Sequence, residues 1–168
     1  PRRLVRVGRK GEMMTKDDTQ HRPKVPDAAV GAYRLRREAL AVAIADLGSE
    51  LDEIAAQPTP DLDSFGSALR DLLATLRRHV EESEAPDGLI AQVIDDAPLF
   101  ARQAEQLRGE HDGLLEVANE LIERAEAGDA IESLVADARE LARRLSEHRQ
   151  RGTDLLLNAY MLDMSAGD

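Results

Sequence analysis

An all-α fold is predicted by three features of this sequence. Leu, Ala, Glu and Arg dominate, whereas aromatic residues make up only 2% of the chain and Trp is absent, which favours helices over strands. From residue 27 onward, apolar positions recur at alternating steps of three and four, the spacing of one helix face. Short segments containing Pro or Gly separate these stretches. Together they predict an up-down-up-down antiparallel four-helix bundle.

The first half of the chain is expected to form two helices. One covers residues 27–56, with leucines and isoleucines in register, and the proline-containing segment 57–60 ends it. Asp61 is the expected N-cap of the second helix, because an aspartate side chain accepts hydrogen bonds from the first free backbone N–H groups. That helix is expected to end at Pro-Asp-Gly, residues 86–88.

The second half is expected to form a short apolar segment and two further helices. Residues 89–94 are the apolar segment, and the stripe of the following helix runs from Val93 through Ala97 and Phe100 to Ala125. A turn is expected at Gly-Asp, residues 128–129. The last helix carries its stripe over residues 134–162, and residues 165–168 are expected to fray.

Charge divides the chain into two parts. The net charge is -11, but residues 1–13 carry five basic residues against one acid, so the remainder has a net charge of -15. Residues 1–26 are expected to be a flexible basic and polar lead-in, and those before Met13 and Met14 are interpreted as upstream sequence. The bundle domain is expected over residues 27–168. Its acidic character predicts that the folded domain does not bind nucleic acid.

Other features exclude further classes of protein. No apolar run approaches the roughly twenty residues that cross a bilayer, so no membrane partner is expected. Without cysteine there are no disulfides or thiolate ligands, and a cytoplasmic location is expected. Since a phosphate-binding glycine loop, a His-Glu-x-x-His pair and a nucleophile elbow are all missing, an enzyme is not expected. The unbroken stripe over residues 27–56 leaves a homodimer open.

Three histidines each take the place of an apolar residue in the stripe of a different expected helix. They are His79, His111 and His148. A histidine in a core stripe costs desolvation unless it has a partner. In an antiparallel bundle, residues at similar distances from a turn lie at similar heights, so His111 and His148 are expected to be level, with His79 within reach. Three imidazoles at one level of a bundle interior indicate a metal site.

The carboxylates near this level limit the number of metal ions. Glu82 follows His79 by three residues and shares its helix face. Glu38 lies as far before segment 57–60 as His79 lies after it, so Glu38 is expected at the same height on the first helix. Two divalent ions a few ångströms apart repel by on the order of ten kcal/mol, and few bridging carboxylates are present to offset this. The sequence therefore predicts at most one ion, of iron, zinc or manganese, with an open position for a small ligand. The predicted ligands are His79, Glu82, His111 and His148.

Four phrases in the expected helices carry a resemblance to a known family. They are Leu-Arg-Arg-Glu-Ala at 35–39, Arg-His-Val-Glu-Glu-Ser-Glu at 78–84, Arg-Gly-Glu-His-Asp-Gly-Leu-Leu at 108–115, and Glu-His-Arg-Gln-Arg-Gly-Thr-Asp at 147–154. With these phrases the chain resembles the hemerythrin-like (HHE cation-binding) family from about residue 29 to its end. The resemblance implies a four-helix bundle with a non-haem di-iron centre that binds oxygen, nitric oxide or peroxide.

This chain departs from the family's ligand pattern on all four helices. The departures are Ala39, Ser83, Leu115 and Gly152. A di-iron centre is therefore not expected. The interpretation is a hemerythrin-like protein with a depleted, at most mononuclear site that binds or senses oxygen, nitric oxide or peroxide.

A second interpretation needs no metal. The three histidines then fix the helix register by hydrogen bonds, in an interaction or regulatory module that retains only the bundle. Their expected partners are a trapped water, Glu38, Glu82, Ser83 and Thr153. The glycines near the histidine level indicate either a small-ligand cavity or tight helix packing. These glycines are Gly109, Gly113 and Gly152.

Overall fold

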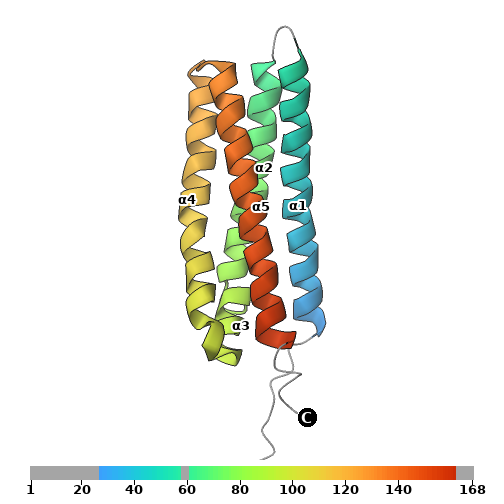
Figure 1. Cartoon of the computed structure of the whole chain (residues 1–168), viewed down its shortest axis with the longest axis vertical. Helices are drawn as coiled ribbons and strands as arrows, with labels where there is room; N and C mark the ends of the chain where they lie inside the picture. The colour runs from blue at the N-terminus through green and yellow to red at the C-terminus, as the bar shows by residue number, and fades with distance from the viewer. Residues whose placement is uncertain (1–26, 58–60, 162–168) are drawn as a thin grey trace, which may run out of the picture.

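The computed structural model describes residues 27–57 and 61–161, and every regular element in these two ranges is a helix. This confirms the all-α class. Four long helices lie side by side (Figure 1): α1 (Asp27–Ala56), α2 (Leu62–Glu84), α4 (Ala101–Glu126) and α5 (Ile131–Met161). A short helix, α3 (Leu89–Asp96), and a 3₁₀ turn, η1 (Pro98–Phe100), connect α2 to α4. The expected lead-in, residues 1–26, lies outside the described residues.

Each long helix packs against two others. Helix α1 contacts α2 and α5, and α4 contacts the same two helices, so the side chains that face inward share one interior. Helix α3 lies at the lower end in Figure 1, where it packs against α2 and α4. None of the helices in the described ranges is long and apolar enough to cross a membrane.

Local sequence signals fix several helix ends where they were expected. The Asp61 Oδ1 atom accepts hydrogen bonds from the backbone N–H groups of Asp63, at 3.0 Å, and Ser64, at 3.4 Å, which confirms the predicted N-cap of α2. Between α4 and α5, Gly128 has φ of 81°, a left-handed conformation that only glycine adopts without strain. The turn predicted at Gly128-Asp129 is therefore present.

The prediction of a single long helix with its stripe over residues 93–125 is wrong, because the backbone leaves the helical conformation at Ala97, directly before Pro98. Proline lacks a backbone N–H and excludes the residue before it from the helical region. Ala97 is accordingly non-helical, with φ of -133° and ψ of 67°. Residues 89–96 therefore form a separate short helix, α3. The chain then changes direction through η1 before α4 begins.

Gly88 brings the start of α3 close to the end of α2. A Cβ atom at this position would lie 2.5 Å from the Ser83 carbonyl oxygen and 2.6 Å from that of Glu82, closer than such atoms approach. Glycine is therefore required for this contact. The close approach carries Leu89 and Ile90 into the interior, where both are buried.

The core consists of two hydrophobic clusters with the histidines between them. The larger cluster lies between the four long helices and includes Leu51, Leu76, Leu114 and Leu145. The smaller cluster joins α3 to α4 and α5 and comprises Leu89, Ile90, Val93, Ala104, Leu107, Leu155 and Ala159. Along α4 and α5, His111 and His148 fall between the two clusters, so the polar layer is enclosed by apolar side chains above and below.

Candidate metal centre

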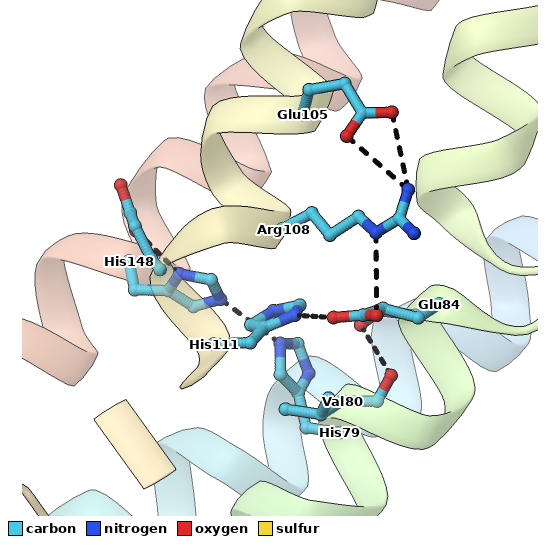
Figure 2. A network of polar contacts seen from close by, with 9 residues as sticks. His79, Val80, Glu84, Glu105, Arg108, His111 and His148 are labelled. Carbon is cyan, nitrogen blue, oxygen red and sulfur yellow. Dashed lines mark hydrogen bonds and ion pairs between the residues drawn. The ribbon is translucent and has the colours of Figure 1, made fainter. Parts of the chain in front are cut away.

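Helices α2, α4 and α5 bring three histidine side chains together in the interior. His79, His111 and His148 each offer a ring nitrogen, and these atoms all lie within 4.8 Å of one another. The rings point toward one another (Figure 2), with centroids 4.9 to 5.5 Å apart. His111 is 1% exposed and His148 2% exposed, whereas His79 is half-buried. The three histidines are close enough to bind a single metal ion.

His111 is held from behind by a carboxylate. Its Nδ1–H donates to the Glu84 Oε1 atom at 2.6 Å, and the Arg108 Nε atom lies 3.6 Å from the other oxygen of Glu84 (Figure 2). Because an ionised carboxylate can only accept, the hydrogen bond places the imidazole proton on Nδ1. The lone pair of His111 then lies on Nε2, which is buried and has no hydrogen-bond partner among the described residues.

His148 repeats this arrangement with different residues. Its Nδ1–H donates to the Glu110 Oε2 atom at 2.8 Å, and Arg151 Nη2 donates to the same oxygen at 2.8 Å. The His148 lone pair is thereby placed on Nε2, which lies 3.3 Å from the Nε2 atom of His79. In their neutral forms, both histidines therefore present a lone pair on Nε2 to the shared interior.

Burial and ion pairing shift two pKa values at the site. Desolvation lowers the pKa of His148 below its ordinary value, and this outweighs the hydrogen bond to Glu110, which acts in the opposite direction. For Glu110, burial raises the pKa, but the hydrogen bonds from Arg151 and His148 outweigh burial and bring it below its usual range. Both shifts favour a neutral imidazole on an ionised carboxylate, the protonation state that metal ligation requires.

A small cavity adjoins the three imidazoles. Its volume is about 10 Å³, roughly the space that one water molecule requires. Leu89 and Ile90 of α3 close it on one side, and the buried Gly152 of α5 lines it on another. The space beside the three imidazoles is therefore about the size of one water molecule or one ion.

The geometry fits the donor set of a transition metal. Two nitrogen ligands at 2.0 to 2.1 Å from a zinc ion, separated by a tetrahedral angle, lie about 3.3 to 3.4 Å apart. The 3.3 Å between the Nε2 atoms of His79 and His148 matches this spacing. Metal-ligating histidines almost always donate their other ring N–H to a carboxylate, carbonyl or water, as His111 does to Glu84 and His148 to Glu110.

The carboxylates expected beside the histidines are not the ones that contact His111 and His148. Glu82 is half-buried and is not part of the three-residue group, and Glu38 and Ala39 on α1 are exposed. Ser83 Oγ donates to the Val80 carbonyl, and Thr153 Oγ1 donates to that of Arg149. His111 and His148 thus bond to Glu84 and Glu110, whereas Ser83 and Thr153 bond to backbone carbonyls of their own helices.

A sequence signal for Glu110 exists, although same-helix spacing does not reveal it. Positions at equal distances from the turn after α4 lie at the same height, which is why His111 and His148 are level. By the same rule position 110 lies opposite position 149, beside His148. Glu110 therefore serves a histidine on the neighbouring helix and not its own neighbour His111. Glu84 has no comparable signal, because the α3 and η1 insertion shifts the register between α2 and α4.

The structure also distinguishes the two interpretations of the helix-interior glycines. No atom lies within 4 Å of a Cβ placed at Gly109, and the nearest at Gly113 is the Arg144 Nη2 atom at 3.8 Å. Tight helix packing is therefore wrong as the explanation of these two residues. Gly152 differs, since it is buried and lines the cavity at the histidines.

Fold and site define a class of protein, an all-helical protein with a buried three-histidine cluster able to hold one metal ion. Comparison of the sequence with protein-family models, with curated proteins and with solved structures finds no match. The resemblance to hemerythrin-like proteins accordingly stays a prediction.

Proposed function

We propose that this protein is an antiparallel up-down-up-down, hemerythrin-like bundle that binds one transition-metal ion through the Nε2 atoms of His79, His111 and His148. The observation that carries the proposal is the Nε2 atom of His111, buried and without a hydrogen-bond partner among the described residues. A buried polar atom left unpaired costs about 1–3 kcal/mol. A metal ion accepts its lone pair and removes that cost.

The donor atoms favour some metals over others. Imidazole nitrogens suit zinc, iron, copper and nickel, whereas manganese prefers oxygen ligands. Of the three ions that the sequence predicts, zinc and iron are therefore proposed over manganese. Glu82, one turn along α2 from His79, stays a prediction as a carboxylate ligand.

The small cavity determines which ligand could reach such an ion. A bound ion would supply a Lewis-acidic position for a ligand. The cavity of about 10 Å³ admits a ligand of about the size of water, and oxygen, nitric oxide or peroxide would enter with a shift of its lining side chains. Glu84 and Glu110 keep the Nε2 atoms of His111 and His148 directed at the ion. We propose that the protein binds or senses such a small molecule in the cytoplasm.

Titration of metal-free protein with Co²⁺ tests this function. Cobalt substitutes for zinc, and its visible absorption reports nitrogen coordination. We expect saturation at one equivalent for the wild type and loss of the signal in His111→Ala. His21→Ala, a histidine outside the described residues, is the matched control and is expected to titrate like the wild type. Equal binding by all three proteins would contradict the proposal.

One contact favours the metal-free module as the second candidate. The 3.3 Å between the Nε2 atoms of His79 and His148 also suits a hydrogen bond in which His79 donates. The histidines would then fix the register of α2 against α5. Absence of any Co²⁺ signal in the wild type would favour this candidate.

A further inference from the structure

An open groove lies between α4 and α5, and Glu110, which accepts the hydrogen bond from His148, is one of the residues that line it. It consists of two hollows of about 720 and 560 Å³ that share Gly109, Glu110 and Arg151. The larger hollow falls within the size range of small-molecule sites. It is distinct from the buried cavity of about 10 Å³ at the histidines.

Gly109 keeps this groove open. Glycine inside a helix is less stable than alanine, so a packing requirement is the usual reason for it. Here no atom lies within 4 Å of an added Cβ, so packing supplies no such reason. Gly109 lines both hollows, and a side chain at this position would project into them. The space that Gly109 leaves is therefore available to a ligand.

The larger hollow has two opposite charges side by side. Arg151 and Asp154 both line it, and their spacing of three residues places them on one face of α5. Arg151 uses Nη2 for Glu110, and a guanidinium has five N–H donors. Asp154 Oδ1 accepts from Gln150, which fixes the carboxylate. This pair complements a molecule with a carboxylate beside an ammonium group.

The rest of the hollow is lined by amides. Gln103 of α4 and Asn158 of α5 both line it, and Asn158 lies seven residues from Arg151, roughly 10 Å along the helix. The buried Leu107 and Leu155 form an apolar floor. A ligand held by its charged groups at Arg151 and Asp154 would thus extend along amides that both donate and accept hydrogen bonds.

We propose that this groove binds a free α-amino acid with a polar, amide-bearing side chain. Its carboxylate pairs with Arg151, its ammonium group with Asp154, and its side chain lies toward Gln103 and Asn158. The site requires no metal, although it shares Glu110 and Arg151 with the hydrogen bonds behind His148.

Nuclear magnetic resonance of metal-free ¹⁵N-labelled protein titrated with L-glutamine tests the proposal. We expect saturable shifts of the backbone amides around Gly109, Arg151 and Asn158, with a dissociation constant of about 1 mM or below. N-acetyl-L-glutamine, which lacks the ammonium group, and L-glutaminamide, which lacks the carboxylate, are expected to bind at least about tenfold more weakly.

Two variants complete the test. Asp154→Asn and Gly109→Leu are each expected to weaken binding at least about tenfold, whereas Glu105→Gln, outside the hollow on α4, is expected to bind like the wild type. Shifts elsewhere, no saturation, or an analogue that binds as tightly as L-glutamine would overturn the proposal. Failure here leaves the Co²⁺ titration unchanged, so it is distinguishable from failure of the metal site.

Discussion

At the scale of single residues, the buried imidazole of His111 carries a nitrogen without a hydrogen-bond partner in the metal-free bundle. We expect His111→Leu to raise the free energy of unfolding of metal-free protein by about 1–2 kcal/mol, because leucine fills the stripe and removes an unpaired buried nitrogen. Urea unfolding in the presence of a chelator measures this. A leucine variant less stable than the wild type under these conditions would show that His111 stabilises the bundle without metal.

Glu110 is expected to act as a positioning residue for the metal. Glu110→Gln keeps the shape of the side chain but weakens the hydrogen bond that orients His148, so metal affinity should fall about 10- to 100-fold. Competition with a chelator of known affinity measures this fall. Glu120→Gln, an exposed substitution on the same helix away from the histidines, serves as the control and should leave the affinity unchanged.

The lowered pKa of His148 predicts a pH dependence. Below its ordinary pKa near 6.5 the unfolded histidine binds a proton, whereas the buried one stays neutral to a lower pH. The unfolded state then binds more protons, so the stability present above pH 6.5 is lost as the pH falls toward the folded pKa. Urea unfolding of metal-free protein between about pH 7.5 and 5.5 measures this loss. A His148→Gln variant with an equal loss would contradict it.

Sequence reasoning locates the histidines but not their supporting residues. The positions of His79, His111 and His148 follow from helical periodicity and the turns, because both fix height and direction in a bundle. The hydrogen bonds of Glu84 and Glu110 depend on how α4 rotates against α2 and α5, and this rotation is set by packing across the whole interface.

At the scale of elements, Gly88 determines how α3 covers the histidines. An added methyl group would collide with the carbonyl oxygens of Ser83 and Glu82, so Gly88→Ala is expected to lower the melting temperature. Gly48→Ala in α1 is the matched control. Nothing lies within 4 Å of its added Cβ, and it should raise the stability by up to about 1 kcal/mol. Calorimetry measures the melting temperatures of both variants. Equal shifts in melting temperature would contradict the role of Gly88.

The helix ends show where sequence patterns suffice. Asp61 and Gly128 define local hydrogen bonding and backbone conformation, and both ends lie where the sequence predicts them. The break at Pro98 escapes a reading of periodicity, because Val93, Ala97 and Phe100 keep the apolar spacing across it. Apolar spacing predicts which side chains face inward. It does not predict whether the backbone between them stays helical.

At the scale of the whole molecule, the two hydrophobic clusters enclose the histidine layer. The structure confirms an all-helical protein whose three histidines meet in the interior. A single bound ion would join α2, α4 and α5 at the level between the two hydrophobic clusters. Metal binding and stability are therefore expected to be coupled.

Elemental analysis of protein expressed with iron, manganese and zinc supplied tests the central claim most directly. The wild type is expected to contain about one equivalent of zinc or iron, and His111→Ala to contain none. Two equivalents in the wild type would restore a dinuclear centre. Wild-type protein without metal, with the same composition as the variant, would contradict the metal site and leave the bundle as an interaction or regulatory module.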